Sequence, residues 1–236
     1  MMASLGAKSS TYEARRSQVE AYFDRTAAET WRRLTSDAPV SGIRATVRAG
    51  RDRMRAALLG RMPADLTGRR VFDAGCGTGA LAIEAARRGA EVVAVDISPT
   101  LVEIARQRTP ADLRGSVQFA AGDMLSAGFG RFDHVVAMDS LIHYDVADIV
   151  RMAERLAGTC DRTLLFTFAP RTPLLALMHA AGRLFPRGSR SPSLEPVRES
   201  DLRHRLAATL GGWEAGWSER VASGFYTSQA LEVARR

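Results

Sequence analysis

The sequence of 236 residues has almost no lysine and very little cysteine. Lys8 is the only lysine among 33 basic residues, so nearly all of the positive charge behind the net +7 is arginine. The arginines are spread along the chain and form no dense basic block, which weakens the case for a nucleic-acid-binding surface. We expect most of them on a solvated surface, with an anion-attracting face as the alternative, because the planar guanidinium suits carboxylates and phosphates.

Few features of the chain point to export or to a metal. Its two cysteines, Cys76 and Cys160, argue against a disulfide framework and predict a reducing compartment. Together with four scattered histidines they lack the spacing of metal ligands, so no protein-bound metal is expected. The first ten residues hold no apolar signal segment and no run of about 18 apolar residues occurs. These absences predict a cytoplasmic protein.

The first 62 residues carry apolar side chains at intervals of three and four, which is typical of helices. Two helices, over residues 10–34 and 41–62, are expected on either side of a break at Pro39. We expect residues 1–62 to form a helical extension that acts as a lid, and residues 63–236 to form the main domain.

From residue 70 onward, short apolar strands alternate with helices, which predicts a mostly parallel sheet covered on both faces. Strands are expected at Arg70–Ala74, Glu91–Val95, Val117–Ala120, Phe132–Met138 and Leu164–Ala169. Helices are expected at Ala80–Arg88, Pro99–Arg108, Ala147–Ala157 and Glu199–Leu210. Two last strands, Trp213–Arg220 and Ala222–Thr227, should form a hairpin. The prediction is an α/β fold with a seven-stranded, mostly parallel sheet, a C-terminal antiparallel hairpin, and an insertion over residues 170–196 after the fifth strand.

The segment V-F-D-A-G-C-G-T-G, residues 71–79, joins the first strand to the next helix. Gly75, Gly77 and Ala80 fit a dinucleotide-binding turn, although a tight turn without a ligand is also consistent with this spacing. Asp73 lies two residues before the first glycine, where its carboxylate would repel a pyrophosphate and attract an ammonium or sulfonium group. The charge therefore favours a cationic ligand.

Two further acids follow the next strands. Asp96 ends V-V-A-V-D, where a carboxylate can accept both hydroxyls of a ribose. Asp123, in the Gly-Asp-Met run after the third strand, can accept an adenine amino group. A nucleoside with a positively charged end is the ligand that these acids share, and the pattern resembles the S-adenosylmethionine-binding half of the Rossmann-like class I methyltransferases. The resemblance assigns these residues to the cofactor: Asp73, Gly75, Cys76, Gly77, Gly79, Asp96, Ile97, Asp123, Met124 and Asp139.

The motifs of nucleic-acid methyltransferases are missing from the sequence. Where base-directed amino-methyltransferases carry an Asn/Asp-Pro-Pro-Tyr/Phe turn, this chain reads M-D-S-L-I-H-Y, residues 138–144, without proline. Neither cysteine follows a proline, so the nucleophile of cytosine C5 enzymes is also lacking. We therefore expect a small-molecule acceptor and no nucleic-acid partner.

Four segments are similar to the magnesium protoporphyrin IX O-methyltransferases of bacteriochlorophyll biosynthesis. They are V-E-A-Y-F-D-R-T-A (19–27), A-M-D-S-L-I-H-Y (137–144), L-F-P-R-G-S-R-S-P (184–192) and G-F-Y (224–226). The resemblance implies methyl transfer from S-adenosylmethionine to a propionate carboxylate of magnesium protoporphyrin IX. It also implies Tyr22 and His143 as catalytic residues, magnesium that arrives within the substrate, and the porphyrin-binding subunit of magnesium chelatase as a partner.

The residues fit such a substrate in physical terms. A carboxylate is ionised at pH 7 and needs no strong base, so positioning and exclusion of water should carry the reaction. Arginines that are candidates for the propionates are Arg15, Arg16, Arg25, Arg32, Arg44, Arg48, Arg187 and Arg190. The apolar segment 172–187 is either a wall of the porphyrin site or a peripheral contact with the photosynthetic membrane. Two alternatives stay open: another small-molecule carboxyl or amine methyltransferase, and a non-catalytic S-adenosylmethionine or porphyrin carrier.

Overall fold

The computed structural model describes residues 4–22, 24, 32, 34–35, 42–171 and 194–236. Two N-terminal helices, α1 (Ser4–Ala21) and α3 (Gly42–Gly60), precede the sheet. The predicted apolar helix within 172–187 lies outside the described residues, as does most of the second half of the helix expected over 10–34.

The remaining elements alternate as the sequence predicts. They are β1 (Arg70–Ala74), α4 (Ala80–Arg87), β2 (Glu91–Asp96), α5 (Pro99–Arg108), β3 (Ser116–Ala121), β4 (Phe132–Ala137), α6 (Val146–Gly158), β5 (Cys160–Phe168), α8 (Glu199–Thr209), β6 (Trp213–Ser223) and β7 (Tyr226–Arg235). The seven strands form one sheet in the order β3-β2-β1-β4-β5-β7-β6. The first five strands are parallel, and β7 pairs antiparallel with both β5 and β6. The predicted fold class is confirmed.

The C-terminal hairpin turns later than the sequence predicted. The structure places the turn at Gly224 and Phe225, with Ser223 paired to Tyr226, and β7 continues to Arg235. The expected turn near residue 221 is therefore wrong. Gly224 has a φ of +57°, which suits glycine, and β7 lies between two strands, so its apolar run shows no clear alternation with polar residues.

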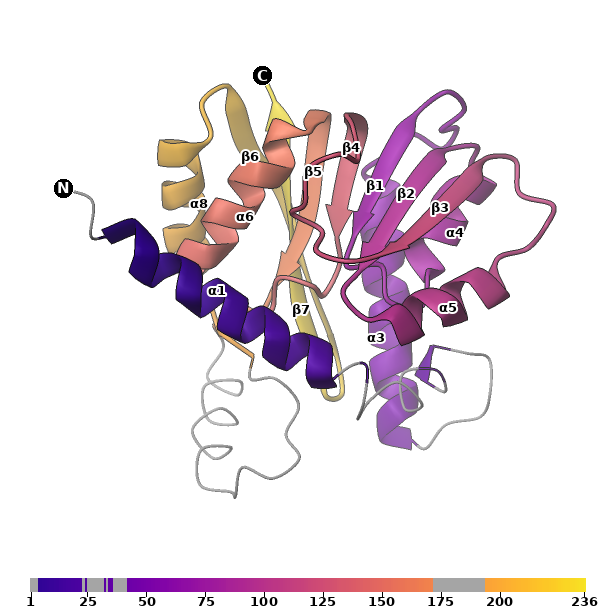
Figure 1. Ribbon diagram of the computed structural model, residues 1–236, viewed down its shortest axis with the longest axis horizontal. Helices are drawn as coiled ribbons and strands as arrows, with labels where there is room; N and C mark the ends of the chain where they lie inside the picture. Colours follow the sequence, from indigo (N-terminus) through magenta and orange to yellow (C-terminus); the bar gives the residue numbers. More distant parts are fainter. Residues whose placement is uncertain (1–3, 23, 25–31, 33, 36–41, 172–193) are drawn as a thin grey trace.

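Helices cover both faces of the sheet (Figure 1). One apolar core joins α3, α4 and α5 to the sheet and includes Met54, Leu58 and Val102. The other joins α6 and α8 to the opposite face and includes Ile149 and Leu202. Because each helix buries one apolar stripe, the loops at the carboxyl ends of the parallel strands are held in fixed positions.

Side chains cap two of the helices that follow the parallel strands, α5 and α6. The hydroxyl of Ser98 accepts a hydrogen bond from the Leu101 backbone at 3.3 Å, and Pro99 follows as the first residue of α5, as predicted. Asp145 caps α6 by accepting from the Asp148 backbone at 2.8 Å. Such caps typically stabilise a helix by about 1 kcal/mol and define where each loop ends.

The ends of the 170–196 insertion meet beside β5. Pro170 forms a parallel bridge with Val197, whose backbone N–H donates to the Ala169 carbonyl at 2.8 Å. The insertion therefore leaves and re-enters the domain at the carboxyl end of β5.

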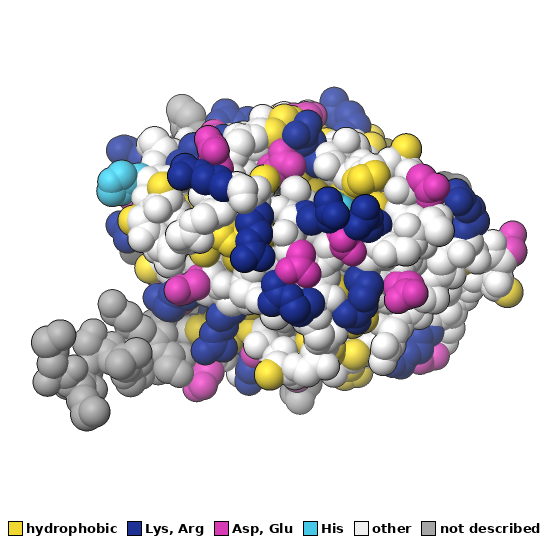
Figure 2. Space-filling view, turned by 90° about the horizontal axis from the view of Figure 1, so that it is seen from above, with side chains coloured by type: hydrophobic (Ala, Val, Ile, Leu, Met, Phe, Trp, Pro, Cys, Tyr) yellow, Lys and Arg dark blue, Asp and Glu magenta, His cyan; other side chains and the backbone are white. Residues whose placement is uncertain are grey.

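Arginines at the amino ends of the parallel strands are mixed with acids. The view from above in Figure 2 shows Lys/Arg and Asp/Glu side chains interspersed, without a uniform basic field. Asp133 pairs with Arg69 at 3.0 Å and with Arg162 at 3.1 Å, and Asp161 pairs with Arg131. No helix among the described residues is long and apolar enough to cross a bilayer.

The packing of α3 on the hairpin gives the first prediction. A Cβ at Gly50 would lie 2.5 Å from Cδ1 of the Tyr226 ring. Alanine favours a helix over glycine by about 1 kcal/mol, but overpacking typically costs about 1–3 kcal/mol. We expect Gly50→Ala to lower the free energy of unfolding, measured by urea denaturation.

Gly60→Ala is the matched control, since Gly60 ends the same helix and a Cβ there would have nothing within 4 Å. It should leave stability unchanged or slightly raised. Equal effects of the two substitutions would show that the contact with Tyr226 does not restrict this position.

Candidate active site

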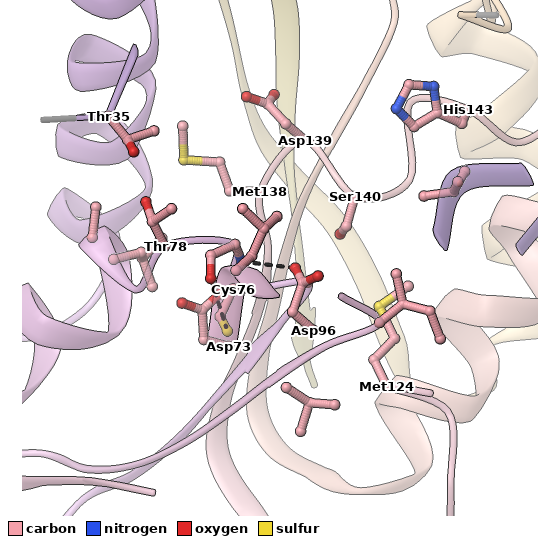
Figure 3. A pocket seen from close by; sticks show the side chains of 18 of the residues that line it. Thr35, Asp73, Cys76, Thr78, Asp96, Met124, Met138, Asp139, Ser140 and His143 are labelled. Carbon is pink, nitrogen blue, oxygen red and sulfur yellow. Dashed lines mark hydrogen bonds between the residues drawn. The ribbon is translucent and has the colours of Figure 1, made fainter. Parts of the chain in front are cut away.

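A cavity of about 300 Å³ opens at the carboxyl ends of the parallel strands. The loops that follow β1, β2, β3 and β4 form its floor and one side, and helices α1 and α3 contribute further walls. Figure 3 shows Asp73, Cys76 and Asp96 close together in one part of the lining, called the floor below, and Asp139 and His143 in another part. Most of the residues that the sequence assigned to a cofactor therefore meet here.

The glycine turn lets two loops approach each other. Gly75, Gly77 and Gly79 have φ values of +87°, +53° and +81°. A Cβ at Gly75 would lie 2.4 Å from Cβ of Ser140 in the loop after β4. Glycine is required there because a side chain would clash and because a positive φ disfavours other residues. Gly79 precedes α4 and is not among the described residues that line the cavity.

Asp73 is the most deeply buried acid of the cavity. Its exposed fraction is 1%, and its Oδ2 atom has no hydrogen-bond partner among the described residues. Burial, followed by the negative charge of Asp96, raises the pKa of Asp73 to about 7. A buried carboxylate with an unsatisfied oxygen is costly, and a cationic ligand would remove the cost.

Asp96 is held by two backbone N–H groups. Its Oδ2 accepts from Gly77 at 2.7 Å and its Oδ1 accepts from Ser98 at 2.9 Å. Burial raises its pKa, while these two hydrogen bonds act in the opposite direction. The two hydrogen bonds also hold the carboxylate in one orientation at the cavity floor, beside Ile97. A fixed orientation is what a carboxylate needs to accept two ribose hydroxyls at once.

Asp123 contacts α1, which the sequence did not predict. Its Oδ1 accepts from the Tyr12 hydroxyl at 2.9 Å, and its Oδ2 accepts from Nη1 of Arg16 at 2.9 Å. The Tyr12 ring stacks on Tyr144, with centroids 5.6 Å apart. Tyr12 and Arg16 are four residues apart and so share one helix face. This spacing was the only sequence signal for a shared contact of Tyr12 and Arg16, and it does not identify Asp123 as their partner. Met124 also lines the cavity.

Asp139 links four elements at the mouth of the cavity. It has a φ of +56°, the only positive value of a non-glycine residue in the described chain. Its carboxylate accepts from Arg51 of α3 at 2.6 Å, from Ser228 of β7 at 3.0 Å, and also from Tyr226 and Thr167. These bonds engage both carboxylate oxygens and link α3 to the sheet. Asp139 also lines the cavity, and its contact with a cofactor stays a prediction.

Two sequence models of families match the chain. The model described as a methyltransferase domain matches residues 71–161, and the one described as the C-terminus of magnesium-protoporphyrin IX methyltransferase matches residues 137–235. A magnesium-protoporphyrin O-methyltransferase of Rhodobacter capsulatus is 50% identical over 94% of this chain and 98% of its own length. The chain belongs to the magnesium-protoporphyrin O-methyltransferase family.

A solved member of this family shares the fold. The crystal structure of magnesium protoporphyrin IX methyltransferase from Synechocystis PCC 6803 with bound SAH has a TM-score of 0.80 and 32% identity, and covers 94% of this chain and 100% of that chain. A chloroplastic relative from Arabidopsis thaliana is 31% identical over 91% of this chain and 70% of its own length. The predicted resemblance is confirmed.

The two residues that the family resemblance marks as catalytic lie in different surroundings. His143 is buried, at 5% exposure, and lines the cavity in the loop between β4 and α6. Tyr22 is half-buried just beyond the end of α1 and is not among the described residues that line the cavity. Its catalytic role stays a prediction.

The arginines that the sequence offered for the propionates lie in different places. Arg16 and Arg48 line the cavity, whereas Arg15 forms an ion pair with Glu195 at 2.7 Å. Arg32 and Arg44 are exposed and lie outside the cavity lining. Arg25, Arg187 and Arg190 lie outside the described residues. In the part of the chain that the structure describes, no group of three or more His, Cys, Asp or Glu residues is placed to hold a metal ion.

The link formed by Asp139 gives the second prediction. Asn keeps the shape of the side chain and tolerates the positive φ, and Asp139→Asn removes the charge and turns one of the two acceptor oxygens into an NH2 donor. Because hydrogen bonds to a charged group contribute about 1.5–3 kcal/mol, we expect a loss of stability of about that size in urea denaturation.

Asp52→Asn serves as the control, since Asp52 lies on the same helix, pairs with Arg55 and has a side chain that is 49% exposed. Exposed pairs contribute about 0–1 kcal/mol. If Asp139→Asn costs no more than Asp52→Asn, the link between α3 and the sheet does not depend on this charge.

Proposed function

We propose that this protein transfers the methyl group of S-adenosylmethionine to a propionate carboxylate of magnesium protoporphyrin IX and forms the monomethyl ester. The unsatisfied oxygen of Asp73 at the cavity floor is the observation that carries the proposal, because it calls for a cation. The identity of 50% to the Rhodobacter capsulatus methyltransferase, over nearly the full length of both chains, supports the choice of acceptor.

The described residues fit the cofactor piece by piece. Asp73 would face the ammonium group, Asp96 the ribose hydroxyls, and Asp123 the adenine amino group. Asp123 already accepts bonds from Tyr12 and Arg16, so α1 would close over the adenine end. When bound, the cofactor supplies a methyl group on a positively charged sulfur.

The protein's own residues would act by placing the acceptor. A propionate is ionised at neutral pH, so His143 need not remove a proton from it and would instead orient the carboxylate or accept a proton from a neutral acid. Tyr22 is proposed to assist in the same task. His143 is buried, so a carboxylate that reaches it would be shielded from water, which would strengthen its attack.

The direct experiment incubates the protein with magnesium protoporphyrin IX and methyl-labelled S-adenosylmethionine. We expect label in a porphyrin monoester separated by chromatography. Tight porphyrin binding without an ester would refute catalysis and favour the carrier.

The elevated pKa of Asp73 gives the third prediction. Below pH 7 the ligand-free protein holds Asp73 mostly protonated, since its pKa is about 7. An ammonium group beside it favours the carboxylate and lowers that pKa, so binding at pH 6 should release close to one proton. Affinity should therefore rise with pH up to about 7 and then level off.

Calorimetry at pH 6 in buffers of different ionisation enthalpy measures this proton. Asp73→Asn should bind more weakly and release none through this group. Proton release that is the same in the wild type and in Asp73→Asn would assign it to another residue, such as Asp96.

His143 gives the fourth prediction. We expect His143→Ala to lower kcat by about 10²–10⁴-fold if it moves a proton, and by less if it only orients the propionate. Cofactor affinity should stay nearly intact, because the acids of the floor are unchanged. His204→Ala is the control, since His204 is exposed on α8. A His143→Ala protein that turns over normally would remove this residue from the reaction.

Delivery of the substrate is also part of the proposal. The porphyrin is flat and apolar, so we propose collection at the surface of the photosynthetic membrane or transfer from the porphyrin-binding subunit of magnesium chelatase. Residues 1–62 are proposed to act as the lid, and residues 170–196 as the cap that follows β5.

A further inference from the structure

We propose that the α3 wall of the cavity binds the second carboxylate of the substrate, the propionate that is not methylated, through Arg48 and Arg55. This inference rests on the proposed function, because it assumes an acceptor with two acidic side chains. It assigns a binding role to one face of a helix that precedes the methyltransferase domain.

Charge in the cavity is divided between two sides. Asp73, Asp96 and Asp123 belong to the loops after β1, β2 and β3 and suit the cationic and hydroxyl groups of the cofactor. The α3 wall carries three arginines and one acid and is net positive: Arg48, Arg51, Arg55 and Asp52. Anions should therefore bind on the α3 side, away from the acidic floor.

The arrangement of this wall follows from helix geometry. Residues 48, 51, 52 and 55 are spaced by three, four and seven positions, so they share one face. Met54 and Leu58 lie on another face and are fully buried against the sheet domain. The arginine face is thus held by a packed core rather than by the ligand.

The three arginines differ in their protein contacts. Arg51 donates to Asp139 at 2.6 Å and links α3 to the sheet. Arg48 donates through Nε to the Leu34 carbonyl at 2.9 Å, and it lines the cavity as a planar fork that suits a carboxylate. Arg55 pairs at 2.9 Å with Asp52, and because the side chain of Asp52 is 49% exposed, solvent weakens this pair. We therefore assign the second carboxylate to Arg48 and Arg55.

The propionate that reacts is proposed to lie at His143, on the side of the cavity away from α3. Figure 3 shows Asp139 between Thr35, on the α3 side, and His143. A substrate whose first propionate reaches His143 presents the second towards α3. This second carboxylate stays ionised after the reaction, so the monoester product should still contact the arginines, whereas a diester should not.

The test compares two esters in equilibrium binding. Magnesium protoporphyrin monomethyl ester and dimethyl ester are titrated by fluorescence into the protein saturated with S-adenosylhomocysteine. We expect the wild type to bind the monoester at least about tenfold more tightly, which is the usual scale of charge-assisted hydrogen bonds. In the double variant Arg48→Gln, Arg55→Gln, the two esters should bind nearly equally.

Two further variants separate charge from folding. Arg44→Gln removes the same charge from the exposed start of α3, outside the cavity lining, and should keep the full preference for the monoester. Arg48→Lys with Arg55→Lys should restore part of it, because the charge returns without the planar fork. Unchanged affinity of the double Gln variant for S-adenosylhomocysteine shows that the cavity is intact.

Three outcomes would overturn the inference: a wild type that binds both esters equally, a double variant that keeps the preference, or an equal loss for both esters. Turnover of the wild type is measured in parallel. If the protein prefers the monoester but forms no ester, methyl transfer is refuted and the binding of the second carboxylate by Arg48 and Arg55 is retained. If it forms the ester without the preference, only the binding role of these two arginines is refuted.

Discussion

Two carboxylates buried at the ends of neighbouring parallel strands constrain the whole cavity. Burial and the negative charge of Asp96 raise the pKa of Asp73, whereas Asp96 is compensated by two backbone N–H donors. Asp73 keeps one oxygen without a partner among the described residues. The ligand-free protein can reduce this cost by protonating Asp73, and a positively charged ligand would offset it by stabilising the carboxylate.

The rest of the structure keeps this floor closed and in place. The glycine turn allows the loops after β1 and β4 to approach, as the clash of a Cβ at Gly75 with Ser140 shows. On one side, Asp123 attaches α1 through Tyr12 and Arg16; on the other, Asp139 attaches α3. The N-terminal helices are thus joined to the domain by acids at the carboxyl ends of its strands, which are also the positions where ligands bind in open α/β sheets.

Much of the fold could be predicted from local patterns. Alternating strands and helices, the Ser98 cap and the D-x-G-x-G-x-G turn are local signals, and each was found where it was expected. The hairpin turn was misplaced because β7 lies between two strands and its apolar residues therefore do not alternate with polar ones. Gly224 was the better signal for the turn.

The candidate site was predicted less evenly. Acids after successive parallel strands must meet at one edge, so Asp73, Asp96 and Asp123 were predictable together. Tyr12 and Arg16 lie 111 and 107 residues from their partner Asp123, a distance that no local pattern covers. Likewise, the contacts of Asp139 with Arg51, Tyr226 and Ser228 depend on how α3 and the hairpin pack. These contacts show a structural role for Asp139 that the sequence did not indicate, while its predicted contact with the cofactor is untested.

The measurement that tests the central claim most directly compares two ligands that differ by one amino group. Calorimetry would measure the binding of S-adenosylhomocysteine and of its analogue without the amino group to the wild type and to Asp73→Asn. If Asp73 holds a cation, the wild type should lose at least about tenfold in affinity for the analogue, and Asp73→Asn should distinguish the two ligands only weakly. An equal loss in both proteins would contradict the account.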